Sequence, residues 1–391
     1  MTTTNRSWTV SAQQDVRYRV ETSFDILNPA NPALIDGEYG SRRLIVTDTT
    51  VDALYGDKIR AYASANLSEH RILVLPHGES NKRWTAVEAV LEAIESFKLD
   101  RRREPVIAIG GGVLTDIVGF ACSIYRRNTP FVRVPTTLIG IVDASVGVKT
   151  GVNFQTGKNK IGTYFAASRS LLDTSFLASL GARHVSNGLA EILKIALIKD
   201  RELFTLLEEH GATALGGRFQ DHNEAEQAII DRAIAGMLEE LEPNLWEQTL
   251  ERLVDYGHSF SPTVEMKALP ELLHGEAVCL DMALTTAISV HRGLVSTEQA
   301  RRIFTVMGEL GLPVTHPAMT AENLLDGLAD TTRHRNGLQR LPLPVGIGSA
   351  VFVNDLGPAD ITSALEILAS AARSGNTARV ADNARLEGAV V

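Results

Sequence analysis

The amino-acid sequence predicts an α/β domain built on a Rossmann-like parallel sheet, followed by an all-α domain. Strand-like and helix-like segments alternate over residues 43–137, which is typical of a parallel sheet flanked by helices. From about Val185 to Leu310 the periodicity becomes mainly helical. With 391 residues, the chain is long enough for two hydrophobic cores. We place the domain boundary near Gly181–Asn187, which divides the chain into residues 1–183 and 184–391.

The elements of the first domain follow from local patterns. Short apolar runs predict strands at Arg43–Asp48, Arg71–Pro76, Pro105–Gly112 and Phe131–Thr137. Apolar residues at helical spacing predict helices at Thr85–Phe97 and Leu114–Tyr125. The tail after Ser374 is polar and poorly patterned, so we expect it to be loosely held.

The composition indicates an ordinary globular enzyme. Hydrophobic residues make up 44% of the chain and charged residues 22%, and the net charge of −9 argues against nucleic-acid binding. Cys122 and Cys279 lie in apolar runs, which favours buried thiols over a disulfide. The first residues lack the apolar core of a signal peptide, and no run approaches the ~18 apolar residues of a membrane span. We therefore expect a cytoplasmic protein without a membrane or nucleic-acid partner.

A glycine cluster follows the third predicted strand. Gly110, Gly111 and Gly112 precede a helix, where glycines let the backbone approach a pyrophosphate and free N–H groups face it. Asp48 ends an earlier strand and can accept hydrogen bonds from ribose hydroxyls. Other polar residues follow neighbouring strands, namely Glu79, Lys82, Thr136 and Thr137. The pattern favours a dinucleotide site, and a tight strand-to-helix turn without a ligand is the alternative.

The stretch of residues 143–160, DASVGVKTGVNFQTGKNK, is rich in lysine, asparagine and glycine. Its lysines are separated by small and apolar residues, and we expect the stretch to be rich in loops. Ammonium and amide donors that converge on a loop suit a phosphate monoester, whereas a solvated surface loop is the alternative. The residues concerned are Lys149, Asn153, Lys158, Asn159 and Lys160, with Arg126 and Arg127 available to the same anion across a subunit interface.

Two histidines and a carboxylate suggest a catalytic metal site. His258 and His274 each adjoin a glycine, and Glu191 lies in an apolar helical run. Two imidazoles and one carboxylate leave a coordination position open for substrate, as catalytic zinc sites do. Lys194 lies three residues after Glu191 and shares its helix face. Histidines hydrogen-bonded within a core are the alternative, and these ligands do not separate zinc from cobalt.

The ordered motifs are specific for a known superfamily. They are GGGVLTDIVGF, RVPTTL, DASVGVKTGVNFQTGKN, NGLAEILK, DYGHSFSP and LLHGEAV. From about Ser7 to Asp355 the chain resembles the sugar phosphate cyclases, whose best-known type is 3-dehydroquinate synthase. The resemblance implies an NAD-binding α/β domain, a helical metal-binding domain, a cleft between them and a homodimer that acts on a small sugar phosphate.

The resemblance also implies a role for individual residues. It implies that one divalent metal, Zn or Co, is held by Glu191, His258 and His274. The implied catalytic groups are Asp116, Asp143, Lys149, Asn159, Lys194, Asp255 and His334, with Arg127 reaching the phosphate in the partner subunit. The implied NAD-binding residues are Asp48, Glu79, Lys82, Gly111, Gly112, Asp116, Thr136, Thr137, Lys158 and Ser179.

Departures from the dehydroquinate synthase pattern bear on the substrate. Asp255 and Pro262 replace an asparagine and a second histidine of the motif NxGHTxGHAxE. Counting without gaps, the arginine and lysine that bind the substrate carboxylate fall on Glu251 and near Met237. Such a carboxylate would lack its cationic partners at a cost of several kcal/mol. We therefore expect a substrate without a carboxylate, which argues against dehydroquinate synthase itself.

Three segments resemble one branch of the superfamily. They are DYGHSFSP, RHRNG at residues 333–337 and the opening segment SWTV…DVRYRVETSFDIL. They are similar to 2-epi-5-epi-valiolone synthases, which act on sedoheptulose 7-phosphate. The positions that separate this branch from its sisters are Leu241, Asp255 and His334. Desmethyl-4-deoxygadusol and 2-epi-valiolone synthases use the same substrate and are close alternatives. A 2-deoxy-scyllo-inosose synthase, an NAD- and metal-dependent dehydrogenase of the glycerol type and a non-catalytic nucleotide-binding paralogue are more remote.

The resemblance implies a reaction without net redox change. NAD oxidises a hydroxyl transiently, phosphate leaves by β-elimination, the hydride returns, and an aldol closure forms the ring. The sequence does not determine the product's stereochemistry or which group accepts the proton.

Overall fold

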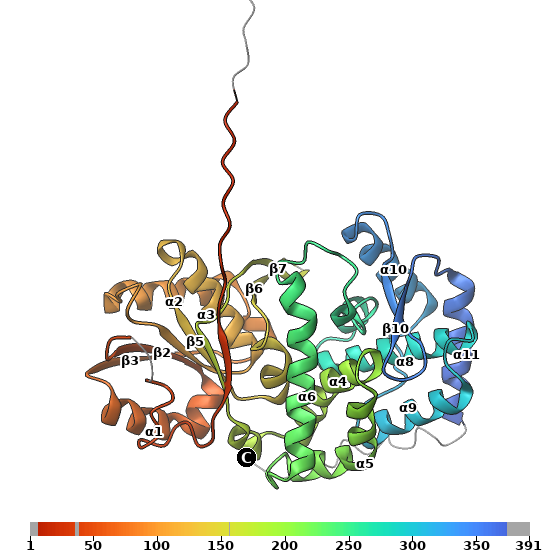
Figure 1. Cartoon of the computed structure of the whole chain (residues 1–391), viewed down its shortest axis with the longest axis horizontal. Coiled ribbons are helices and arrows are strands. Elements are labelled where there is room, and N and C mark those ends of the chain that lie inside the picture. The colour runs from red at the N-terminus through yellow and green to blue at the C-terminus, as the bar shows by residue number, and fades with distance from the viewer. Residues whose placement is uncertain (1–6, 36–38, 156, 374–391) are drawn as a thin grey trace, which may run out of the picture.

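The first half of the chain is a parallel α/β domain. The structure is a computed structural model, and it describes residues 7–35, 39–155 and 157–373. All strand pairs of the six-stranded sheet are parallel (Figure 1), with the order β1-β8-β5-β4-β2-β3. The strands are β1 (Arg19–Thr22), β2 (Arg42–Asp48), β3 (Glu69–Leu75), β4 (Val106–Gly110), β5 (Phe131–Pro135) and β8 (Arg169–Leu172). The four predicted strands are therefore present, and β1 and β8 extend the sheet beyond them.

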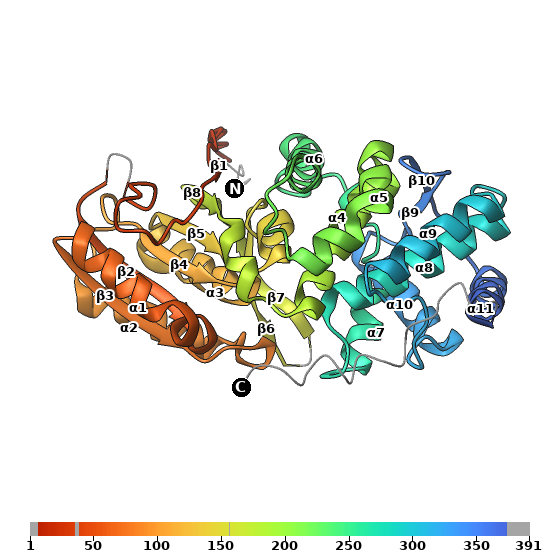
Figure 2. The same ribbon diagram turned by 90° about the horizontal axis from the view of Figure 1, so that it is seen from below.

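Helices cover both faces of this sheet. They are α1 (Thr49–Asn66), α2 (Trp84–Phe97) and α3 (Gly112–Ile124). Leu44 and Val46 pack with residues of α2 and α3, whereas Ile45, which points to the opposite face, packs with α1. Figure 1 shows the sheet between α1 on one side and α2 with α3 on the other, and Figure 2 shows the same domain from the side of α1. Because both faces are buried, the strands read as continuous apolar runs in the sequence.

The stretch of residues 143–160 is not rich in loops, so that expectation was wrong. A π-helical turn (Gly140–Ala144) leads into an antiparallel hairpin of β6 (Lys149–Phe154) and β7 (Gly157–Tyr164). Gly151 pairs with Gly162, and a side chain on either would collide with the opposite backbone. The glycines that suggested loops thus permit close strand pairing, and Val152 buries an apolar side chain on the inner face.

The second half is mainly helical, as predicted. Its helices are α4 (Ala182–Ile198), α5 (Arg201–Gly217), α6 (Glu224–Leu241), α7 (Ser261–Lys267), α8 (His274–His291), α9 (Thr297–Glu309), α10 (Ala321–His334) and α11 (Pro358–Arg373). In α4 and α8 nearly every residue is buried, so these two helices form the centre of the domain. A small antiparallel pair, β9 (Leu341–Pro344) with β10 (Ala350–Val353), adds strands that the helical periodicity did not predict.

Other sequence predictions concern the cysteines, the tail and membrane spans. Cys122 and Cys279 are both buried and free, as expected. Within the described ranges, no helix has the length and apolar character needed to cross a bilayer. The tail after Ser374, expected to be loosely held, lies outside the described residues. The sheet ends at Leu172 and α4 begins at Ala182, and the domain boundary near Gly181–Asn187 stays a prediction.

Candidate active site

The three predicted metal ligands meet in one place. Ligand atoms of Glu191, His258 and His274, which we call the metal group, all lie within 4.8 Å of one another. Nε2 of His258 is 3.7 Å and Nε2 of His274 is 3.5 Å from Oε1 of Glu191. Glu191 lies in the middle of α4, His274 is the first residue of α8, and His258 lies in the turn before α7. Glu191 and His274, which are 83 positions apart, thus meet because α4 and α8 pack together.

Both imidazoles are oriented by their second nitrogen. Nδ1 of His258 is 3.0 Å from the carbonyl oxygen of Tyr256, and Nδ1 of His274 is 3.0 Å from Oε2 of Glu265. An Nδ1–H that donates to these oxygens leaves the lone pair on Nε2, facing Glu191. Within the described part of the chain, Oε1 of Glu191 is buried without a hydrogen-bond donor. An unsatisfied carboxylate oxygen between two imidazole nitrogens fits a divalent cation with an open position.

A buried ammonium compensates the Glu191 carboxylate. Lys194 Nζ is 2.5 Å from Oε2 of Glu191 and 3.9 Å from Oδ1 of Asp143. Burial opposes the charge of Lys194, but the two carboxylates keep its pKa above the usual value. Burial also acts to raise the pKa of Glu191, but Lys194 and the imidazoles hold it well below normal. The pKa of Asp143 is raised, mainly by burial, so this carboxyl holds a proton more readily than Glu191 does.

The two histidines differ in their affinity for protons. Burial lowers the pKa of His258 to about 4. Burial acts in the same sense on His274, but the nearby carboxylates of Glu191 and Glu265 raise its pKa to about 9. Because a metal needs the Nε2 lone pair, a bound ion must displace a proton from His274, and metal affinity should fall as the pH falls.

Glu265 is a site residue that sequence reasoning missed. It lies on α7 and orients His274. It also forms an ion pair with Lys158, whose Nζ is 2.5 Å from Oε1 of Glu265. Despite its burial, these partners lower the pKa of Glu265 to about 2. Lys158, predicted to bind NAD, thus links hairpin β6–β7 to the metal group. Glu265 is the final glutamate of the motif NxGHTxGHAxE, and this signal could have found it. Only the packing of α7 against α8 shows that its partner is His274.

The carboxyl ends of the central strands lie where the sequence predicts a dinucleotide site. The chain order of the sheet reverses between β2 and β4, and ligands of open α/β sheets bind at such a reversal. Asp48 ends β2, and its Oδ1 accepts the backbone N–H groups of Thr50 and Val51. No side chain caps the N-terminus of α3 after Gly111, and a Cβ at Gly111 would lie 3.4 Å from Thr137 Cγ2. Free N–H groups beside a bare glycine suit a pyrophosphate.

Lys82 connects several of the predicted residues near these strand ends. Lys82 Nζ lies 2.6 Å from Oδ2 of Asp116 and 2.6 Å from Oδ1 of Asn159. Glu79 Oε1 accepts from Nδ2 of Asn153 at 2.8 Å. Residues predicted separately for NAD binding and for catalysis therefore form one polar network between the loop after β3 and the hairpin.

A second charged cluster joins the hairpin to the helical domain. Lys149 pairs with Glu247, and Arg252 pairs with both Glu247 and Asp255. Arg335 Nη2 lies 3.2 Å from Oδ2 of Asp255. Sequence reasoning assigned no role to Glu247, Arg252 or Arg335. Arg335 lies in the segment RHRNG, from which only His334 was singled out, and the three residues meet only through the fold.

Known proteins are similar to this chain over most of its length. The family described as 3-dehydroquinate synthase N-terminal matches residues 72–187, and 3-dehydroquinate synthase C-terminal matches residues 188–333. The chain belongs to the 3-dehydroquinate synthase-like family of sugar phosphate cyclases. A 2-epi-5-epi-valiolone synthase from Actinomyces sp. is 54% identical over 370 residues, which cover 92% of this chain and 97% of the relative. A demethyl-4-deoxygadusol synthase from Trichormus variabilis is 38% identical and covers 92% of this chain and 89% of its own.

A solved cyclase structure is also similar to this chain. It is a 2-epi-5-epi-valiolone synthase from Streptomyces hygroscopicus subsp. jinggangensis with NAD+ and Zn2+ bound. The TM-score is 0.89 at 54% identity, and the match covers 93% of this chain and 99% of the other. The predicted family and fold are thereby confirmed.

Three predicted residues of this cyclase-family chain are exposed and belong to none of these clusters. The His334 side chain is 57% exposed and its Nε2 is 3.6 Å from Oδ1 of Asp330, while the neighbouring Arg335 contacts Asp255 instead. Ser179 hydrogen-bonds Tyr55 at 2.7 Å on the surface. Arg127 is exposed in a left-handed backbone conformation. Their roles in catalysis, NAD binding and the partner's site stay predictions.

The substitutions that set the chain apart from dehydroquinate synthase have clear places. Met237 is buried in the core of the helical domain. Glu251 lies 3.7 Å from Arg340 near the surface, and Pro262 occupies the first turn of α7, where a missing N–H costs nothing. This region still holds two cations, Arg252 and Arg335. Both of them pair with the carboxylate of Asp255.

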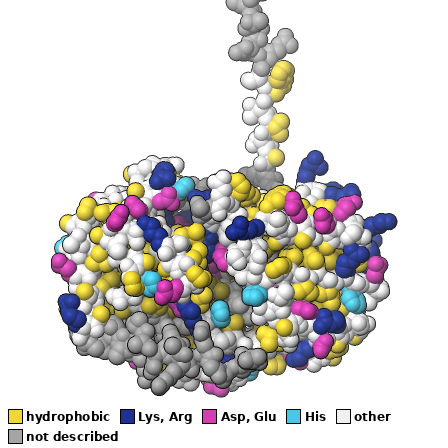
Figure 3. All heavy atoms as spheres, turned by 180° about the vertical axis from the view of Figure 1, so that it is seen from behind, with side chains coloured by type: hydrophobic (Ala, Val, Ile, Leu, Met, Phe, Trp, Pro, Cys, Tyr) yellow, Lys and Arg dark blue, Asp and Glu magenta, His cyan; other side chains and the backbone are white. Residues whose placement is uncertain are grey.

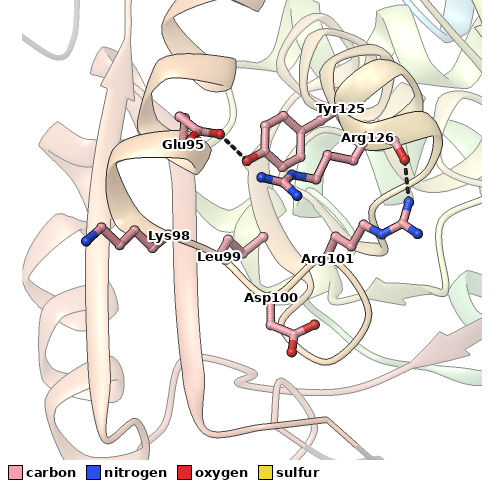
Figure 4. Close-up of a pocket in the computed structure, with 7 residues that line it drawn as sticks. All are labelled: Glu95, Lys98, Leu99, Asp100, Arg101, Tyr125 and Arg126. Atoms are coloured by element: carbon pink, nitrogen blue, oxygen red, sulfur yellow. Dashed lines mark hydrogen bonds between the residues drawn. The ribbon is translucent and has the colours of Figure 1, made fainter.

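A separate hollow lies on the α/β domain, away from the metal group. It has a volume of about 330 Å³ and lies where α2 and α3 end (Figure 4). Tyr125 donates to Glu95 at 2.5 Å across it, and Arg101 donates to the carbonyl of Arg126. On the face drawn in Figure 3, basic and acidic side chains are interspersed. The hollow holds none of the predicted metal or NAD residues.

Proposed function

We propose that this protein is a 2-epi-5-epi-valiolone synthase that cyclises sedoheptulose 7-phosphate and releases phosphate. Phosphate leaves by elimination, which makes the enzyme a carbon–oxygen lyase. The observation that carries the proposal is the complete metal group in a chain 54% identical, over 370 residues, to a synthase of that name. The 38% identity to a demethyl-4-deoxygadusol synthase supports that alternative less.

We propose NAD and one divalent metal, zinc or cobalt, as cofactors. When bound, NAD supplies a hydride acceptor and donor, and the metal supplies a Lewis acid that polarises substrate oxygens. Glu191, His258 and His274 would hold the metal, and the strand ends at Asp48 and Gly111 would hold the dinucleotide. The unsatisfied Oε1 of Glu191 and the uncapped N-terminus of α3 support these sites.

The surrounding charges suit proton and phosphate handling. Lys194 keeps its ammonium charged beside the metal group, where it can stabilise negative charge on a substrate oxygen. Asp143, whose pKa is raised, can hold a proton at its carboxyl. Lys158 and Asn159 lie on the hairpin between the strand ends and the metal group, where their donors can bind a leaving phosphate.

The proposed function is tested with the purified protein, NAD and either metal. Sedoheptulose 7-phosphate should yield one equivalent of inorganic phosphate without accumulation of NADH, and NMR should identify 2-epi-5-epi-valiolone. Steady NADH production would replace the proposal with a glycerol-type dehydrogenase. A different cyclitol would replace it with one of the sister synthases.

We also propose a homodimer in the cytoplasm, with Arg127 reaching the partner's phosphate site. The exposure of Arg127 on an outward turn supports this arrangement. Mixing an inactive Arg127→Ala chain with an inactive His274→Ala chain should restore part of the activity, because one site of the mixed dimer is intact. No recovery in mixed dimers would contradict a shared site.

A further inference from the structure

Glu247 is a charged residue at the junction of the domains to which no motif assigns a role. Its carboxylate pairs with Lys149 and Arg252, and its Oε2 accepts the hydroxyl of Tyr164 at 3.0 Å. Arg252 also pairs with Asp255. We call these residues, together with Arg335, the Glu247 network. The Glu247 side chain is only 21% exposed, so its charge is largely withdrawn from solvent.

Local contacts fix the conformation of the segment that carries Glu247. Asn244 closes the segment, because its side chain accepts from Thr249 N at 3.0 Å and donates to Thr249 O at 2.7 Å. Trp246 meets Tyr164 of the hairpin edge to face, with ring centroids 5.9 Å apart. Glu247 itself has a left-handed φ of 54°, a conformation that a non-glycine residue adopts at some cost. A solvated loop residue would not need this support.

The Glu247 network lies beside the reaction site. Burial is the main influence on the pKa values of Asp143 and Asp255, and in both cases the charge of Lys149 acts to lower the pKa. Asp255 also adjoins the metal group directly, because its carbonyl oxygen accepts the backbone N–H of His258 at 3.0 Å. The ion pairs Lys149–Glu247, Glu247–Arg252 and Arg252–Asp255 therefore connect the hairpin to the segment that holds His258.

Most of the positive charge in the Glu247 network is already matched by carboxylates of the protein. Three cations, Lys149, Arg252 and Arg335, meet two carboxylates, Glu247 and Asp255. A substrate carboxylate that entered here would find Lys149 and Arg252 already paired. It would also meet the negative charge of Glu247, and like charges this close are strongly disfavoured.

We propose that Glu247 is a specificity-determining residue whose carboxylate occupies the anion position between Lys149 and Arg252 and so excludes carboxylated sugar phosphates. The inference rests on the proposed function, since it concerns selection among seven-carbon sugar phosphates. It adds a feature that excludes the wrong substrate to the loss of cationic side chains at Glu251 and Met237.

The test compares two ligands on the metal-loaded full chain without NAD, so that no turnover occurs. One ligand is sedoheptulose 7-phosphate, and the other is a seven-carbon 2-keto-3-deoxy acid 7-phosphate. Calorimetry should show that Glu247→Gln improves the affinity for the acid relative to the ketose by roughly tenfold or more, because two cations become available to it. Glu251→Gln, which removes the same charge four residues away, should leave the ratio at the wild-type value.

A second variant keeps the proposal testable if Glu247→Gln fails to fold. Tyr164→Phe removes one donor from Glu247 but keeps its charge, and it should shift the ratio in the same direction by a smaller factor. An unchanged ratio in every folded variant overturns the proposal, and so does an equal shift in Glu251→Gln. Phosphate release by the wild type is measured separately, so a failure of the proposed function is recognised independently of this ratio.

Discussion

The metal group and the Glu247 network are both charged clusters near the domain junction, but they are built differently. The ligands of the metal group come from the helical domain alone, with Glu191 fully buried and the paired Lys194 side chain 2% exposed. The Glu247 network joins a hairpin to a loop, and its Lys149 side chain is 60% exposed. Buried charges need fixed partners because desolvation is costly, whereas partly solvated charges can exchange partners at little cost. The first cluster is thus suited to hold an ion, and the second to discriminate among substrates.

The largest expected effect comes from removing a metal ligand. His274→Ala should lower phosphate release by about 10³-fold or more, because the metal supplies several kcal/mol of transition-state stabilisation. NAD binding should survive, since the strand ends at Asp48 and Gly111 belong to the other domain. Metal content, phosphate release and NAD titration measure the three consequences. Normal turnover by this variant would show that the metal assignment is wrong.

Removing the ammonium beside the metal group should separate the metal-free and metal-loaded states. Lys194→Met leaves the buried Glu191 carboxylate without its nearest cation, at a cost of about 3 kcal/mol to the metal-free protein. A bound divalent ion replaces much of that charge, so the loss should be smaller with metal. Urea unfolding with and without a chelator gives both values. Equal losses in the two states would contradict the compensating role of Lys194.

A smaller effect is expected from the residue that orients His274. Glu265→Gln should weaken metal affinity by about 10- to 100-fold, as loss of a carboxylate partner of a ligating histidine does. The fold should persist, because α7 and α8 keep their apolar contacts. Competition with a chelating dye measures the affinity, and Glu271→Gln, an exposed change on the following turn, is the matched control. Equal affinities in the two variants would show that Glu265 does not position His274.

The difference between the clusters also explains what the sequence could predict. The metal group was predictable because each ligand has a local signature, such as Glu191 within a continuous apolar helix. The strands were predictable because both faces of the sheet are buried and their apolar runs are unbroken. Glu247 has no such signature, because its partner Lys149 lies 98 positions away. Glu265 ends the motif NxGHTxGHAxE, but the motif does not show that its partner is His274, nine positions away across a turn. The hairpin was missed because its glycines also favour loops.

The Glu247 network should contribute little to stability and should respond to salt. Glu247→Gln should change the free energy of unfolding by about 1 kcal/mol or less, since Lys149 is well exposed and the more buried Arg252 keeps Asp255 as its partner. Raising the ionic strength towards about 1 M should shrink that difference, whereas the effect of Lys194→Met should change little because its nearest partner, Glu191, is buried. Urea titrations at low and high salt test this contrast. A large effect of Glu247→Gln that salt does not alter would mean that Glu247 is a structural residue like Lys194.

The smallest expected effect belongs to Glu251, the position on which the carboxylate-binding arginine of dehydroquinate synthase falls. Its side chain is 45% exposed and 3.7 Å from Arg340, a distance and exposure at which ion pairs contribute little. Glu251→Gln should therefore change stability by no more than about 0.5 kcal/mol and leave phosphate release within about twofold of the wild type. The measurements are the same urea titration and phosphate assay used for Glu247→Gln. If Glu251→Gln matched Glu247→Gln in ligand selection, net charge rather than the paired geometry at Lys149 and Arg252 would set the specificity.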